Sequence, residues 1–337
     1  MYSEEDLASA VEAGVLPKDL AEAFRAHAAD RRQSSAADEE HFRLITGFND
    51  IFVVIACLLL LGALAWIGSA AAPGLGPALV ASAAWALAEF FVRKRRMALP
   101  AIVLLIAFSG AVFAVGMWLM GALVGERAGG TGALALAGAL AAAGAWLHWQ
   151  RFRVPITVAA GAAASATCVF SLVLAVLPGA RNWTGAMSLT AGMAVFALAL
   201  RWDAADPRRQ TRHSDVAFWL HLLAAPLLVH PVFTWLRVSD GETSVLPAVA
   251  VVLVYVAIAL VSLSIDRRAL MVSALGYVLY TFSALLAQYG VVSLGFALTA
   301  LTIGSALLLL SAFWHVSRGR LLGHLPLWLQ QRLAPLQ

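Results

Sequence analysis

Two histidines lie within one apolar stretch of the sequence. Their imidazole side chains can gain or lose a proton near neutral pH. His221 and His230 fall in VAFWLHLLAAPLLVHPVFTW (residues 216–235), a run long enough to cross a membrane. Histidine changes charge near neutral pH, and an ionisable side chain inside a membrane is a candidate functional group. Either histidine could bind a polar ligand or a proton, or it could donate a hydrogen bond to a neighbouring helix and serve packing alone.

Two prolines, Pro226 and Pro231, share this run with the histidines. Each lacks a backbone N–H and clashes with the preceding helical turn, so we expect the helix to be interrupted near Pro226. Interrupted helices carry the binding sites of many transporters. His221 and His230 are nine residues apart, and at about 100° per residue they face opposite sides of a helix.

Three further polar residues are candidates for lining a cavity. Glu89 lies well inside a predicted span, one turn before the basic sequence RKRR (93–96), and we expect it to pair with that cluster. Tyr277 and Tyr280 share a face of the predicted ninth span. They could line a cavity for a polar ligand or form hydrogen bonds between packed helices.

No motif of an enzyme or a cofactor site occurs in the sequence. HExxH, GxSxG, a P-loop and CxxC are all missing. Cys57 and Cys168 both lie in apolar runs and have no metal-ligand spacing. We therefore expect no catalytic residue, no cofactor and no metal.

The composition predicts an all-α integral membrane protein. Of 337 residues, 61% are hydrophobic and 12% are charged, whereas soluble domains are about 45–50% apolar and about 25% charged. Ten apolar runs have roughly the length of a membrane-spanning helix. They cover approximately 49–68, 75–92, 99–124, 131–148, 154–177, 184–201, 215–236, 246–265, 269–288 and 291–315.

The loop charges predict five hairpins with both termini in the cytoplasm. Alternate loops and the C-terminal tail hold 15 basic residues, and the intervening loops hold only Arg127, Arg181 and Arg237. Cytoplasmic loops carry such an excess of lysine and arginine. The sequence thus predicts an inner-membrane protein in contact with the lipid bilayer.

Two smaller parts flank the predicted membrane domain, 48–315. Residues 1–47 read as a cytosolic helical hairpin and linker, in which Gly14 ends one helix and Pro17 opens the next. This part holds ten acidic and five basic residues, which argues against nucleic-acid binding. It could rest on the membrane domain or dock a cytosolic protein. Residues 316–337 are predicted to form an amphipathic interfacial tail.

Basic residues followed by a helix start recur along the chain. The four instances are RKRRMALPAIV (93–103), RFRVPITVAAG (151–161), RHSDVAFWLHL (212–222) and DRRALMVSALG (266–276). The recurrence indicates either duplication of a hairpin or the charge rule applied to helices of similar length. Small residues concentrate in 132–146 and 161–167 and predict close helix packing.

The layout resembles uncharacterised bacterial multi-pass membrane proteins. The resemblance rests on the opening DLASAVEAGVLPKDLAEAF, on the succession of Ala/Leu/Gly-rich hairpins and on the ending AFWHVSRGRLLGHLP. It implies the fold and lends no activity. The span count is also similar to that of ten-helix drug/metabolite-type transporters. We expect a transporter-like protein for a small molecule or an ion, with a membrane scaffold or sensor as the alternative.

Overall fold

The computed structural model describes residues 9, 11–24, 48–125, 129–206, 211–235, 245–267, 275, 301, 304–305 and 313–323. The chain divides into two compact units. One comprises Met1–Leu44 with Gln337, and the other comprises Ile45–Leu336.

Helical residues in the N-terminal unit lie on either side of a turn at Gly14. This glycine has φ of 70°, a left-handed conformation in which a Cβ would be strained. The second helical stretch begins directly after Pro17, as the sequence predicts. Ala21 is buried, whereas Leu20 and Phe24 on the same stretch are exposed.

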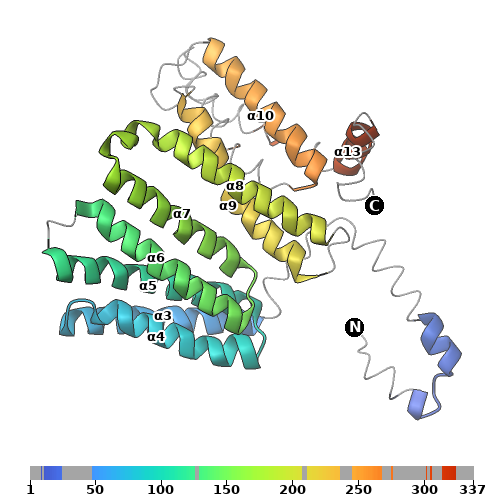
Figure 1. Ribbon diagram of the computed structural model, residues 1–337. Helices are drawn as coiled ribbons and strands as arrows, with labels where there is room; N and C mark the ends of the chain where they lie inside the picture. The colour runs from blue at the N-terminus through green and yellow to red at the C-terminus, as the bar shows by residue number, and fades with distance from the viewer. Residues whose placement is uncertain are drawn as a thin grey trace. The chain divides into compact units, whose positions relative to one another are not determined.

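The regular structure in the described part of the larger unit is helical, without a strand. Figure 1 shows the helices running back and forth along the chain. They are α3 (Phe48–Ala71), α4 (Leu75–Ala88), the π-helix η1 (Glu89–Lys94), α5 (Ala98–Val124), α6 (Gly129–Phe152), α7 (Ile156–Val176), the 3₁₀ helix η3 (Pro178–Trp183), α8 (Thr184–Ala205), α9 (Arg212–Trp235), α10 (Val245–Ile265) and α13 (Trp314–Gly323).

Seven helical segments within the described residues are long and apolar enough to cross a membrane. They correspond to the first seven predicted spans, with η1 continuing α4 and η3 preceding α8. The eighth predicted span is α10, whose apolar segment Val252–Ile265 is shorter. The ninth and tenth predicted spans, 269–288 and 291–315, lie outside the described residues except for isolated positions. The chain is therefore a multi-pass helical membrane protein.

Several helices extend further than the apolar runs that predicted them. Helix α6 ends at Phe152 instead of 148, and α8 ends at Ala205 instead of 201. Arg151 and Asp203, which the sequence assigns to loops, thus belong to helices. Charged side chains at a membrane surface can reach polar surroundings while their backbone continues the helix.

Neighbours in sequence pack side by side from α3 to α7, and α7 then packs against α9, which pairs with α8. One core cluster joins α3, α4 and α5 through residues such as Leu61, Ala84 and Leu104. A second joins α7, α8 and α9 through residues such as Ala199 and Leu220. Half of the membrane-length segment of α9 is buried, the largest share among the seven.

Small residues let the helices approach closely, as the sequence predicts. A Cβ on Gly138 of α6 would lie 2.7 Å from the backbone nitrogen of Cys168 in α7. A Cβ on Gly116 of α5 would lie 2.6 Å from the Cα of Ala137 in α6. A Cβ added to Gly121 or Gly125 of the GxxxG sequence would have no described atom within 4 Å, so these glycines make no close helix contact with the described residues.

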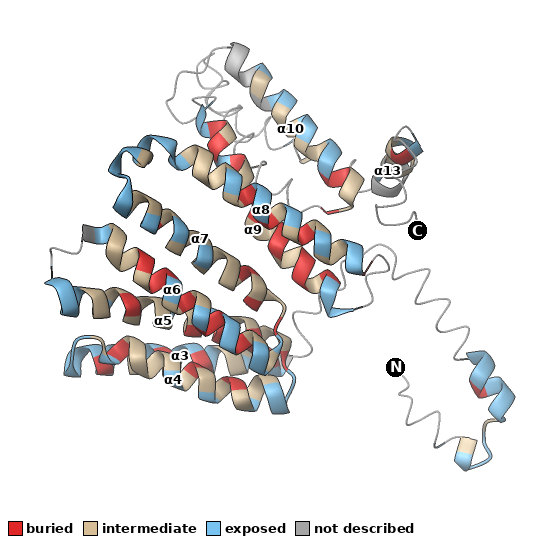
Figure 2. Ribbon diagram, viewed as in Figure 1, coloured by how far each residue is buried: buried red, intermediate tan, exposed pale blue. Residues whose placement is uncertain are grey.

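The outward faces of the helices are apolar. Figure 2 shows exposed residues along α3, α6 and α7 between buried ones. Leu59, Trp66, Trp146 and Leu172 are among these exposed side chains. Large exposed apolar faces on helices of this length are expected where the surrounding solvent is lipid.

Three helices end in the same unusual turn. Arg96, Arg153 and Asp266 have φ of 53°, 56° and 57°, although left-handed backbone is disfavoured for residues with a Cβ. Arg96 and Arg153 are 57 residues apart, and Asp266 follows after another 113, close to twice that interval. The next residue is buried each time: Met97, Val154 or Arg267. Because left-handed residues commonly end helices, this recurrence fits both duplication of a hairpin and the charge rule applied to similar helices.

Candidate functional site: a buried Asp–His–Arg cluster

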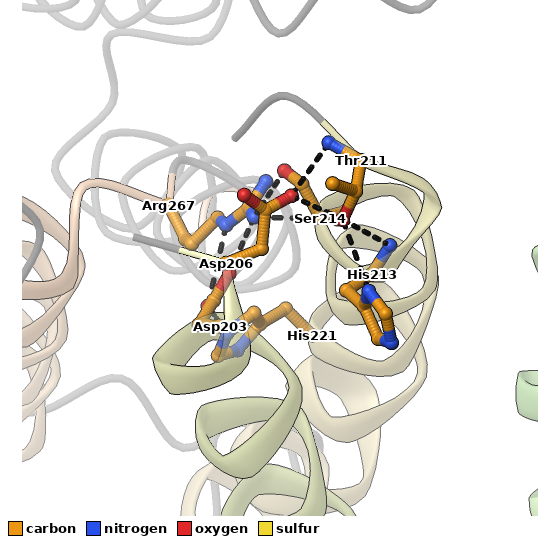
Figure 3. Close-up of polar contacts among 7 residues, drawn as sticks. All are labelled: Asp203, Asp206, Thr211, His213, Ser214, His221 and Arg267. Atoms are coloured by element: carbon orange, nitrogen blue, oxygen red, sulfur yellow. Dashed lines mark hydrogen bonds and ion pairs between the residues drawn. The ribbon is translucent and has the colours of Figure 1, made fainter. Parts of the chain in front are cut away.

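Asp203 joins three elements through its carboxylate. It lies near the end of α8 and accepts hydrogen bonds from His221 of α9 and from Arg267, which follows α10 (Figure 3). His221 Nε2 lies 2.7 Å from Oδ2, and Arg267 Nη2 lies 2.5 Å from Oδ1. We call Asp203, His221 and Arg267 the charged cluster.

Arg267 is positioned by the turn that ends α10. The left-handed Asp266 lets the Arg267 N–H donate to the carbonyl of Ser262 at 3.0 Å, and the Ser262 hydroxyl donates to the carbonyl of Arg267. The guanidinium is only 1% exposed. Besides Asp203 it donates to the hydroxyl and the carbonyl oxygen of Ser214 at 3.1 and 3.3 Å. The cation is thus buried and surrounded by oxygen acceptors.

His221 is enclosed in the contact between α8 and α9. Its side chain is fully buried, and the ring of Phe196 meets it edge to face at 5.4 Å. Donation to Asp203 requires the proton on Nε2. Nδ1 has no hydrogen-bond partner among the described residues.

The start of α9 is capped by the residue that precedes the helix. Thr211 precedes the helix, and its Oγ1 accepts the N–H of His213 at 3.3 Å. Asp206 in turn accepts the N–H and the hydroxyl of Thr211, each at 2.7 Å. Ser214 lies inside the first turn, where its oxygens are available to Arg267. Asp215 is also in the first turn.

The structure separates the two histidines that the sequence singles out. His221 is buried in the cluster, while His230 is exposed on the other side of the helix, as their spacing predicts. The expected interruption at Pro226 is wrong, because α9 continues through Pro226 and Pro231 as one helix. Pro226 itself is exposed. One reason for placing a transporter-type site at midplane is thereby lost.

Glu89 pairs across helices as well as within its own. Arg93, one turn on, donates to it at 3.3 Å, in line with the sequence expectation. Arg151 of α6 makes the stronger, two-pronged contact, with Nε and Nη2 donating at 2.6 and 3.1 Å. Glu89 therefore ties η1 to the end of α6 and lies apart from the charged cluster. Tyr277 and Tyr280 lie outside the described residues.

His148 of α6 is a second fully buried histidine, which the sequence analysis does not single out. Its Nδ1 lies 3.3 Å from the hydroxyl of Thr157 in α7. The rings of Trp85, Phe108 and Phe152 surround it at 4.6–5.9 Å between centroids. Nε2 has no hydrogen-bond partner in the described part of the chain.

Asp203 and Arg267 are the functional candidates that sequence reasoning missed. Both fall in segments assigned to loops because the apolar runs end just before them. The signal that could have found them is positional. Asp203 lies two residues beyond the predicted end of a span, and Arg267 stands in the recurring turn where the two earlier turns have Met97 and Val154.

The arrangement can hold a proton or exchange ion-pair partners. The carboxylate of Asp203 accepts hydrogen bonds from a histidine and an arginine on different elements. The loss or movement of one partner therefore changes the contact with the other. Among the described residues no group of three His, Cys, Asp or Glu side chains is placed to hold a metal ion. Searches of protein-family models, curated proteins and solved structures find no match to this chain.

Proposed function

We propose that this chain is an ion-coupled membrane transporter in which Asp203 is the coupling residue. The observation that carries the proposal is the charged cluster, in which the buried side chains of His221 and Arg267 meet the partly buried Asp203 near the end of the membrane-length helix α8. Charged side chains in such helices are costly and mark ion pathways and proton relays. The class of solute is a small molecule or an ion.

Packing alone does not account for Arg267. In the two equivalent turns the buried position is filled by the apolar Met97 and Val154, which need no partner. Arginine at this position requires oxygen acceptors from both α8 and α9. A buried ion pair is often no more stabilising than apolar residues of similar volume. A functional role supplies the reason for keeping one.

The coupling step follows from the shared carboxylate. A proton on Asp203 removes the negative charge that holds Arg267 and that accepts the His221 hydrogen bond. The end of α10 then loses its ionic attachment to α8, and the helices can change their relative position. Asp215 lies within electrostatic reach of Arg267, and also of Arg212 and Asp206.

The proposed orientation places the charged cluster toward the cytoplasm of a ten-span inner-membrane protein. Supporting contacts gather the basic helix ends at one end of the bundle. Arg151 meets Glu89, Trp149 meets Trp202, and Asp203 meets Arg267. Arg181 lies in η3, before α8 begins, at the opposite end of that helix from Asp203. By the charge rule the basic end faces inward, with both termini inside.

The test is electrical recording from proteoliposomes adsorbed on a solid-supported membrane. Wild-type protein would be challenged with a panel of inorganic ions, amino acids, sugars and organic cations under a pH gradient. We expect a transient current with at least one solute and its loss in Asp203→Asn. Glu89→Gln is the matched control, because it removes a carboxylate bonded to arginine outside the cluster. Wild-type silence across the panel, or an unchanged current in Asp203→Asn, would refute the proposal.

The N-terminal unit supports a second candidate function, that of a docking platform for a cytosolic protein. Val15, Leu20 and Phe24 are exposed apolar residues within this unit. A photo-crosslinking amino acid at Phe24 would then give one discrete product with another protein in cells, and the same probe at Glu22 would give less. Equal diffuse products at both positions would exclude docking by this face.

A further inference from the structure

Six basic side chains surround the connections from η1 to α5 and from α6 to α7. All six are exposed, and we call them the basic rim: Arg93, Lys94, Arg95, Arg96, Arg151 and Arg153. Glu89 is the acidic side chain seen bonded to this rim in the described residues, and it contacts Arg93 and Arg151. One carboxylate against six cations leaves a strong positive excess at a single place.

The rim is ordered by its contacts. Glu89 holds the end of α6 beside η1, which brings the two basic segments together although they are far apart in sequence. The guanidinium of Arg95 lies 5.6 Å from the ring centre of Phe90, and that of Arg153 lies 5.5 Å from the ring centre of Trp149. Such cation–π contacts restrict the arginines before any ligand arrives.

The position of the rim identifies the kind of ligand. It lies at the ends of α4 with η1 and of α6, both of membrane-spanning length, which is the depth of lipid headgroups. Phe90 is 44% exposed beside the cations, so the same surface offers an apolar contact. A free phosphate would use only the charges, whereas a phospholipid has a phosphate and acyl chains that match both features.

We propose that the basic rim is a binding site for the phosphodiester headgroup of an anionic phospholipid. The guanidinium groups donate hydrogen bonds to the phosphate oxygens, and the acyl chains lie along the exposed apolar faces next to Phe90. This site is separate from the charged cluster and does not depend on transport.

The test is native mass spectrometry of the full-length chain equilibrated with mixed micelles of phosphatidylglycerol and phosphatidylcholine. The rim variant combines Lys94→Gln, Arg95→Gln and Arg96→Asn, which leaves the Glu89 contacts in place. Asparagine tolerates the left-handed backbone at position 96. The control variant removes three cations that the sequence assigns to the opposite loops: Arg127→Gln, Arg181→Gln and Arg237→Gln.

Wild type and control are expected to retain phosphatidylglycerol over phosphatidylcholine. At about fivefold per interfacial cation, the loss of three cations should make the rim variant bind phosphatidylglycerol about a hundredfold more weakly. Equal retention of both lipids by wild type, or undiminished phosphatidylglycerol on the rim variant, would overturn the proposal. Complete displacement of the lipid by an equal concentration of sodium phosphate would also overturn it, since the site would then be one for free anions.

If the rim variant does not fold, a second measurement on the wild-type protein tests the same proposal. Retention of phosphatidylglycerol by wild type would then be measured against sodium chloride concentration, because headgroup binding by exposed arginines is screened by salt. A steep fall supports the proposal, and a salt-independent retention contradicts it.

Discussion

At the scale of single residues, substitutions in the charged cluster are expected to destabilise this fold strongly. Arg267 is buried completely, and its acceptors come from Asp203 and Ser214 on two other helices. Removing one member of such a pair leaves a buried charge without its partner, which is strongly destabilising. Removing both members leaves uncharged groups, whose burial costs less free energy. The cost of a substitution here therefore depends on what remains of the cluster.

A double-mutant cycle tests this dependence. Arg267→Met should destabilise the protein by about 3 kcal/mol, because Asp203 loses its cation. Asp203→Asn combined with Arg267→Met should recover at least about 1 kcal/mol of that loss. The measurement is the free energy of unfolding in mixed micelles. Strictly additive effects of the two substitutions would show that the cluster contributes no coupling.

At the scale of elements, the helix contacts depend on a few glycines that admit a neighbouring backbone. Gly138 lies where α6 crosses α7, and Gly121 lies on a part of α5 without a described neighbour. These two positions form a natural pair for comparison, since both are small residues in apolar helices.

Gly138→Val should destabilise the bundle by about 3 kcal/mol or prevent folding. The new side chain would start 2.7 Å from the nitrogen of Cys168 and 2.9 Å from the oxygen of Ala164, so the helices would have to separate. Gly121→Val should change stability little. Thermal unfolding followed by tryptophan fluorescence distinguishes the two, and equal effects at both positions would contradict the packing described for α6 and α7.

The helices were the part of the fold most open to prediction, because an apolar run of fixed length is a strong signal. Seven predicted spans are present as membrane-length helices. The site was harder to predict. His221 was found from its type, but Asp203 and Arg267 meet only when α8, α9 and α10 pack, and apolar runs carry no information about such contacts. The continuity of α9 through Pro226 was missed, since the propensity of proline was weighed without its tertiary surroundings.

At the scale of the whole molecule, the basic ends of the helices predict one orientation in the membrane. The rim residue Lys94 and the η3 residue Arg181 are both exposed and mark opposite ends of the bundle. By the charge rule, the end with the larger basic excess faces the cytoplasm.

Side-specific thiol labelling checks the orientation. In a background with Cys57→Ala and Cys168→Ala, Lys94→Cys should react with an impermeant reagent only from the cytoplasmic side. Arg181→Cys should react only from the opposite side. Both cysteines reacting from the same side would mean that the number of crossings between them is even, which α5, α6 and α7 do not allow.

The distance in sequence between the members of the charged cluster has a consequence for biosynthesis. Asp203 and His221 enter the membrane together with α8 and α9, but Arg267 is synthesised 46 residues after His221. Until it leaves the ribosome, the carboxylate of Asp203 lacks its arginine partner and has only His221. Once Arg267 is synthesised, it can bond to Asp203 of α8 and Ser214 of α9 and so attach the end of α10 to both helices. In a chain truncated before Arg267, His221 remains as the partner of Asp203, and the contact of this carboxylate with the arginine is missing.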